Sequence, residues 1–211
     1  MFFYHRDPTE VFVSVLAIFL VLPIHEWAHA YVAYLLGDYT AKYEGRMSID
    51  PMRHLTLWGS LSLILFGFGW AKPVPINPYN FVKIRDKKVG FALCALAGPA
   101  ANFLMAIICM IIYKLLLFHS GASFLISVFK YLIEINISLM VFNLIPIPPL
   151  DGSRIWSVFL KDETYNKLLM NEQKIIIIVF ILLLTGILEI PLNFLANIVF
   201  NLINLITWFI R

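Results

Sequence analysis

Charged residues are scarce in this sequence: they make up 14% of its 211 residues, whereas hydrophobic residues make up 61%. A soluble globular protein carries about 25% charged and about 45–50% apolar residues. The chain therefore has too few polar side chains to cover a surface that faces water, and the apolar excess must face lipid. This composition excludes intrinsic disorder and a secreted disulfide scaffold, and it predicts an integral membrane protein.

Cysteine is scarce as well. The two cysteines, Cys94 and Cys109, lie in one apolar run, where a helix would separate them by about 22 Å, far beyond disulfide reach. The net charge of +3 comes without a basic stripe interleaved with aromatic residues, so we expect no nucleic-acid partner. Lysine and arginine in such a chain are typical of the cytoplasmic loops of a membrane protein.

Long apolar runs are what the sequence does contain. A transmembrane helix needs about 20 mostly apolar residues. The runs that suit one are Pro8–Leu36, Val89–Phe118, Gly121–Pro146, Ile175–Leu188 and Leu192–Ile210. Leu55–Ala71 is shorter and interrupted by glycines, which predicts a re-entrant segment, and Tyr39–Ile49 has the period-2 pattern of a short β-hairpin. We therefore expect an all-α polytopic membrane protein with about five transmembrane helices, a re-entrant segment and a short β-hairpin.

These segments predict one membrane-embedded domain over residues 1–211, with its core at about 8–160 and a C-terminal helical hairpin at about 174–211. The basic residues orient that domain. If the amino terminus is extracytoplasmic and Leu55–Ala71 is re-entrant, 13 of the 16 basic residues lie on the cytoplasmic side, against 11 if that segment crosses fully. The positive-inside rule favours the first arrangement.

The first apolar run contains the motif His25-Glu26-Trp27-Ala28-His29. On a helix the two histidines lie one turn apart on one face, so both imidazoles can bind one metal ion, and Glu26 can act as a general base. Zinc suits such ligands and lowers the pKa of its bound water to about 7. A chance match is the alternative. An ionisable residue inside a membrane costs about 2.5–3.5 kcal/mol, however, so three within five residues favour a functional metal site.

A third ligand must come from another segment, and Asp151 is the leading candidate. It follows Pro146, Pro148 and Pro149, which end the preceding helix and allow the carboxylate to point back toward the first helix. The alternative is an N-cap for the helix that begins at Gly152. His29 lies about 12 Å inside the helix end at Gly37. The two ligands therefore meet only if that end is cytoplasmic, as the basic residues also indicate.

The combination of His-Glu-x-x-His in an apolar run with Asn-x-x-Pro-x-x-x-Leu-Asp-Gly downstream resembles the site-2 protease family of intramembrane zinc metalloproteases. Further matches are Gly45-Arg46 to Asp50-Pro51 with His54, the stretch from Gly69 to Pro75, and Gly98-Pro99-Ala100-Ala101-Asn102. Together they cover about Leu20 to Gly152. The chain is most similar to the compact bacterial members, which lack PDZ and CBS domains.

The resemblance implies that His25, His29 and Asp151 bind one Zn²⁺ ion and that Glu26 is the catalytic base. It also implies a role for Asn143 near the substrate carbonyl, with an interhelical hydrogen bond as the alternative. Asn102 is expected to pack helices together. His54 is not expected to be a ligand, because a fourth one would close the catalytic position.

The expected function is hydrolysis of peptide bonds within or near transmembrane segments of membrane-protein substrates in the lipid bilayer, with the active site toward the cytoplasm. An edge of the predicted hairpin at Tyr39–Ile49 would bind an extended substrate as an added strand. Two alternatives stay open: a non-proteolytic metal transporter or sensor, and an inactive family member. A transporter would need ionisable residues along a route through the membrane, and an inactive member would not need Glu26.

Overall fold

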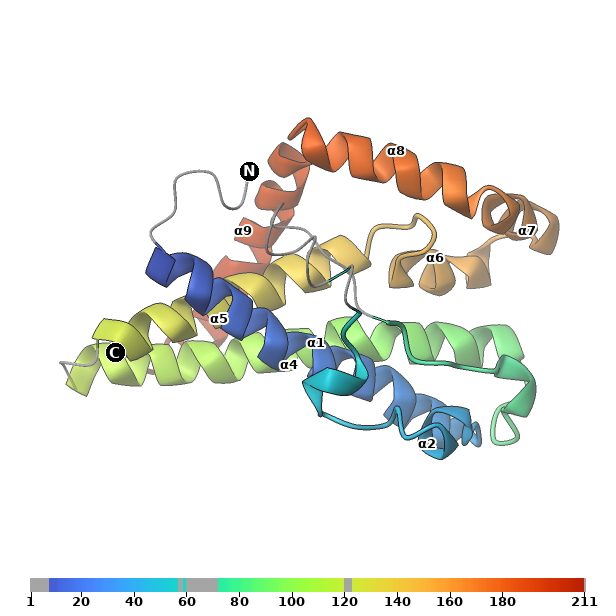
Figure 1. Ribbon diagram of the computed structural model, residues 1–211, viewed down its shortest axis with the longest axis horizontal. Coiled ribbons are helices and arrows are strands. Elements are labelled where there is room, and N and C mark those ends of the chain that lie inside the picture. The colour runs from blue at the N-terminus through green and yellow to red at the C-terminus, as the bar shows by residue number, and fades with distance from the viewer. Residues whose placement is uncertain (1–7, 57–58, 60–71, 120–122, 211) are drawn as a thin grey trace.

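The chain folds into a bundle of helices (Figure 1). The computed structural model describes residues 8–56, 59, 72–119 and 123–210, and its three longest helices are α1 (Pro8–Leu36), α4 (Lys87–His119) and α5 (Ser123–Asn143). The shorter ones are α2 (Thr40–Tyr43), η1 (Pro51–Arg53), η2 (Pro78–Asn80), α6 (Asp151–Trp156), η3 (Ser157–Phe159), α7 (Asp162–Met170), α8 (Glu172–Leu184) and α9 (Glu189–Ile206). Apart from an isolated bridge residue at Leu55, the regular secondary structure of the described residues is helical.

Helix α4 lies at the centre of the bundle. It packs along both α1 and α5, and α9 crosses its carboxyl-terminal half (Figure 1). Buried apolar side chains from these four helices form the core, among them Val21, Met110, Ile133, Ile137 and Ile203, each at most 3% exposed. Because lipid is as apolar as these side chains, close van der Waals packing rather than transfer out of water holds the helices together.

Small residues bring α1 and α4 into close contact. Ala30, Ala33 and Cys94 are fully buried, and Gly98 lies directly against the imidazoles of α1. A Cβ atom built on Gly98 would lie 2.4 Å from His29 Nε2 and 2.6 Å from His25 Cε1. A glycine at this position therefore allows α4 to approach the side chains of the His-Glu-x-x-His motif.

A buried carboxylate anchors the carboxyl-terminal end of α1. Asp38 accepts hydrogen bonds from the backbone N–H groups of Thr40 (3.0 Å) and Asn77 (2.6 Å) and from the amide of Asn80 (3.0 Å). Burial by itself would raise the pKa of Asp38, but these hydrogen bonds outweigh burial and hold the pKa below its usual value. The contact joins the end of α1 to α2 and η2.

The prediction of about five membrane spans is only partly supported. Within the described residues, three helices are long and apolar enough to cross a membrane: α4, α5 and α9. Helix α1 has the predicted bounds, Pro8–Leu36. Helix α8 has 13 residues and is about 20 Å long, which is shorter than a hydrocarbon core of about 30 Å. The predicted re-entrant segment, Leu55–Ala71, lies almost entirely outside the described residues.

The predicted β-hairpin at Tyr39–Ile49 is wrong. Residues Thr40–Tyr43 form α2, and the rest of the segment up to Ile49 is irregular. The carboxylate of Asp38 accepts from the N–H of Thr40 and starts a helical turn, and Ala41 then packs against Ala30 and Val74. A period-2 pattern over only five residues is also compatible with one helical turn. The packing of Ala41 decides between a strand and a helix. The expectation that an extended substrate binds as an added strand along this segment is therefore withdrawn.

Candidate metal centre

Three predicted ligands meet at one point between α1 and α6. His25 and His29 lie one turn apart on α1, and their Nε2 atoms are 3.0 Å apart. The Oδ2 atom of Asp151, the first residue of α6, lies 3.3 Å from His25 Nε2 and 3.2 Å from His29 Nε2. All three residues are buried. The three atoms thus form a nearly equilateral triangle enclosed by protein.

This triangle fits a zinc ion. Two ligand atoms that each lie about 2.0–2.1 Å from a tetrahedral zinc ion are about 3.3 Å from one another, which matches the three observed edges. Two imidazole nitrogens and one carboxylate oxygen are also the donor types that zinc prefers in catalytic sites, where the fourth position stays open. The residues present therefore suit a catalytic zinc ion.

The backbone around Asp151 directs its carboxylate to the histidines. Helix α5 ends at Asn143, and the chain doubles back so tightly that a Cβ on Gly152 would lie 2.3 Å from the carbonyl oxygens of both Leu144 and Ile145. Asp151 does not cap α6, because the N-cap residue is Leu150.

The other ring nitrogen of His29 fixes the tautomer of that imidazole. His29 Nδ1 lies 2.7 Å from the carbonyl oxygen of Cys94 on α4. A carbonyl oxygen only accepts, so Nδ1 carries the proton and the lone pair of Nε2 points toward Asp151 and His25. This is the arrangement in which an outer hydrogen bond orients a metal-binding histidine.

Asn102 plays the corresponding role for His25. Its side-chain amide lies 3.0 Å from His25 Nδ1, with the nitrogen facing the ring, while its Oδ1 atom is buried without a hydrogen-bond partner. The amide oxygen and nitrogen are nearly indistinguishable by shape, and with the two exchanged the oxygen faces the ring. The oxygen then accepts from the Nδ1–H of His25, whose Nε2 is left free to bind a metal.

The sequence alone predicted only a helix-packing role for Asn102, so this contact to His25 is a new finding of the structure. A signal was present in the spacing. Cys94, Gly98 and Asn102 follow at intervals of four and therefore line one face of α4, as His25 and His29 line one face of α1. The two rows run side by side, with Cys94 against His29 and Asn102 against His25.

The predicted general base is held by a proline-rich loop. Oε2 of Glu26 accepts a hydrogen bond of 2.9 Å from the N–H of Val74. Because Pro73 and Pro75 have no N–H, this is the sole backbone donor of residues 73–75. Arg46 donates to the carbonyl oxygen of Lys72 at 2.7 Å and fixes the loop from the other side. The loop thereby orients the Glu26 carboxylate.

Asn143 and His54 do not take part in the triangle of ligand atoms. Asn143 is the last residue of α5, and its amide donates to the carbonyl oxygen of Leu139 in its own helix at 3.0 Å. His54 is fully buried, and its Nε2 lies 2.6 Å from the carbonyl oxygen of Ser48. The role predicted for Asn143 stays a prediction. The hydrogen bond of His54 joins two residues of the segment that follows α2.

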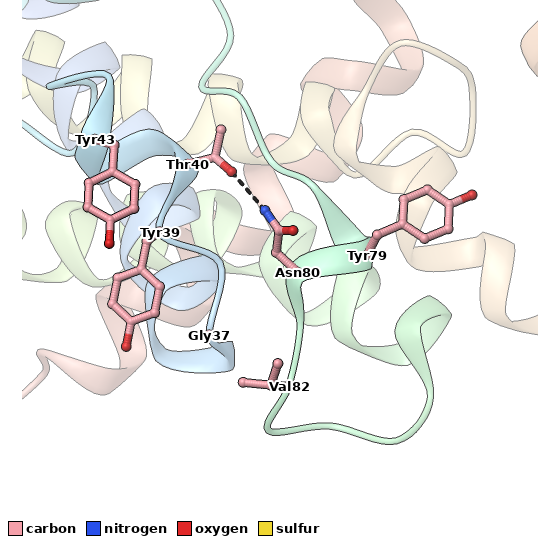
Figure 2. A pocket seen from close by; sticks show the side chains of 7 residues that line it. All are labelled: Gly37, Tyr39, Thr40, Tyr43, Tyr79, Asn80 and Val82. Atoms are coloured by element: carbon pink, nitrogen blue, oxygen red, sulfur yellow. Dashed lines mark hydrogen bonds between the residues drawn. The ribbon is translucent and has the colours of Figure 1, made fainter.

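A pocket of about 400 Å³ lies elsewhere, at the end of α1. Gly37, Tyr39, Thr40, Tyr43, Tyr79, Asn80 and Val82 line it (Figure 2). Asn80 donates to the Thr40 hydroxyl at 3.1 Å, and the rings of Tyr39 and Tyr43 stack with centroids 6.0 Å apart. None of its lining residues is a predicted ligand. The tyrosines suit a membrane–water interface, where amphipathic rings are enriched.

Comparison with known proteins agrees with the geometry. The model of the protein family described as "Peptidase family M50" matches residues 118–187. The Bacillus subtilis protein named "Putative zinc metalloprotease YwhC" is 35% identical over 177 residues, which cover 81% of this chain and 80% of that protein. The Mycolicibacterium smegmatis protein with the same description and the name Rip2 is 29% identical over 83% of this chain and 68% of its own length. No solved structure matches the chain significantly.

The chain therefore belongs to peptidase family M50, the site-2 protease family of intramembrane zinc metalloproteases. The family and the names of its members imply a zinc ion, and His25, His29 and Asp151 are the residues in this structure that suit it. Its apolar helices agree with an integral membrane protein.

Proposed function

We propose that this protein is an active zinc-dependent endopeptidase that hydrolyses peptide bonds within or near transmembrane segments of membrane-protein substrates. The observation that carries the proposal is the triangle of ligand atoms, 3.0–3.3 Å on each edge, next to a carboxylate on the same helix. A transporter would need such ligands at several depths, whereas here they converge on one point.

Each residue has a distinct part in the proposed reaction. His25, His29 and Asp151 would bind the zinc ion, which when bound supplies a Lewis acid that polarises the scissile carbonyl and acidifies the attacking water. Glu26 takes up the proton of that water and delivers it to the leaving nitrogen. The hydrogen bond from Val74 orients the Glu26 carboxylate for this step. Asn143, at the end of α5, is proposed to hydrogen-bond the substrate carbonyl.

The proposed arrangement in the membrane is one domain with an extracytoplasmic amino terminus and a catalytic site toward the cytoplasm. The distribution of basic residues supports it, since 13 of 16 fall on one side when residues 55–71 do not cross fully. The tyrosines around the carboxyl-terminal end of α1 are consistent with a position of that end at the membrane–water interface.

Replacing the general base tests the proposal. Glu26→Gln keeps all three zinc ligands, so we expect an unchanged zinc content and a loss of peptide-bond cleavage of about 100-fold or more, as removal of a general base predicts. Glu44→Gln is the matched control, because Glu44 is exposed and lies outside the site. The measurement is zinc content of the purified protein together with a comparison of membrane proteomes, in which a substrate accumulates uncut with Glu26→Gln. Full cleavage by Glu26→Gln would contradict the proposal.

A further inference from the structure

Helix α9 carries a row of four asparagines that point away from the bundle. Asn193, Asn197, Asn201 and Asn204 follow at intervals of four, four and three residues. At 100° and 1.5 Å per residue, the four lie within an arc of about 80° and along about 16 Å of the helix. All four are exposed, and their side chains make no hydrogen bond within the described part of the chain.

The remainder of α9 is divided into two other faces. Ile203 and Thr207 are fully buried and turn toward α4 and α5, where Lys114 caps the helix end by donating to the carbonyl oxygen of Thr207 at 3.0 Å. Exposed apolar side chains, such as Ile198 and Leu205, form a face suited to lipid. The asparagines lie between these two faces, separate from both.

The two asparagines in the interior of the other membrane-spanning helices have a different environment from these four. Asn102 on α4 and Asn136 on α5 are both fully buried and hydrogen-bonded. An exposed amide at membrane depth has neither water nor protein as a partner, so it favours association with another helix that supplies one. Four such amides on one face of a helix long enough to span the membrane therefore indicate an interhelical interface.

We propose that this asparagine face of α9 is the contact between two copies of the chain. Copies inserted in one membrane share the same orientation, so a two-fold axis along the membrane normal aligns their α9 helices in parallel and brings each asparagine opposite its equivalent. A carboxamide is its own complement, because it has both an acceptor oxygen and two donor hydrogens. Helix α8 is less suited than a second α9 to cover the asparagine face, because residues 175–184 offer no polar side chain.

Cysteine cross-linking in native membranes tests the contact. With an oxidant, Asn197→Cys should form a disulfide-linked dimer at least about 10-fold more efficiently than Ile198→Cys, which is also exposed but turned 100° away. The native Cys94 and Cys109 are buried, so the unmodified chain gives the background. Equal cross-linking at both positions, no dimer from Asn197→Cys, or a cross-link to a different protein overturns the proposal.

Replacement of all four asparagines by leucine tests the contribution of the amides. Four interhelical hydrogen bonds of average strength correspond to about a 50-fold weaker dimer, measured by fluorescence energy transfer between labelled copies in lipid vesicles. Unchanged helicity and zinc content show that the variant is folded. The control replaces Ile198, Leu202 and Leu205 by alanine and should leave the dimer unchanged. Dimerisation equal to that of the unmodified chain, or equal weakening in the control, overturns the proposal.

Discussion

The two halves of α4 differ in what they contact. In the first half, Cys94, Gly98 and Asn102 face the histidines of α1, and each one either hydrogen-bonds to an imidazole or leaves room for it. In the second half, Ala106, Cys109 and Met110 belong to the apolar core with α5 and α9. One continuous helix thus serves as scaffold of the metal centre at one end and as core of the bundle at the other.

This difference explains why the two halves should respond differently to substitution. The first half holds polar atoms at defined distances, so that a change there displaces or releases a ligand. The second half contributes packed volume, so that a change there alters stability and leaves the metal centre intact.

Gly98→Ala should have the largest effect on zinc. The new Cβ would lie within 2.6 Å of both imidazoles, so the histidines or the helix must move. We expect zinc affinity to fall by at least the roughly 100-fold that the strongest outer-shell substitutions cause. Competition with a chelator measures it. Ala100→Val, which adds volume on an exposed face of the same helix, should retain zinc; equal loss in both variants would contradict the assignment.

Asn102→Leu should have the next largest effect, because it removes the acceptor for the Nδ1–H of His25. Zinc affinity should fall by about 10–100-fold, as for other residues that orient a metal-binding histidine. Asn102→Asp keeps an acceptor oxygen and should restore affinity. Asn136→Leu is the matched control, because Asn136 is an equally buried amide on α5 with no contact to the histidines among its hydrogen bonds. A purely structural role for Asn102 would make the two leucine variants alike.

Met110→Ala should lower stability without changing zinc affinity. The side chain is 2% exposed and lies in the core between α4, α5 and α9. Its truncation leaves a cavity and should reduce the free energy of unfolding by about 2–3 kcal/mol. Denaturation in detergent, followed by circular dichroism, gives the change. A loss of zinc affinity comparable to that of Asn102→Leu would show that the two halves of α4 are not independent.

Asp38→Asn should have the smallest effect, about 1 kcal/mol, because the amide keeps one acceptor but loses the charge. The pKa of Asp38 is lower in the folded protein than in the unfolded chain. Its stabilisation is therefore complete above the unfolded pKa of about 3.9 and is lost as the pH falls through the lower folded value. The difference in unfolding free energy between wild type and variant should be constant near pH 7 and shrink below about pH 4. A difference that grows on acidification would contradict this.

Much of the site could be predicted from local spacing. The one-turn separation of His25 and His29 depends only on helix geometry, and the prolines before Asp151 predict where α5 must end. Contacts between distant segments could not be predicted in this way. The Val74 N–H on Glu26 and the Cys94 carbonyl on His29 are backbone groups, which have no signature in a sequence. The hairpin at Tyr39–Ile49 was wrong for the same reason, since Asp38 and the packing of Ala41 decide that segment.

The low charge of the chain, with 14% charged residues, by itself determined a membrane protein and made three ionisable residues in one apolar run conspicuous. The sequence also determined the donor types and their turn-by-turn spacing on α1, because helix periodicity is local. The tertiary structure decided which nitrogen of each imidazole is free, what holds Glu26, and which asparagines are buried or exposed. Those properties depend on atoms from helices far apart in the chain, whose approach is set by packing at residues as small as Gly98.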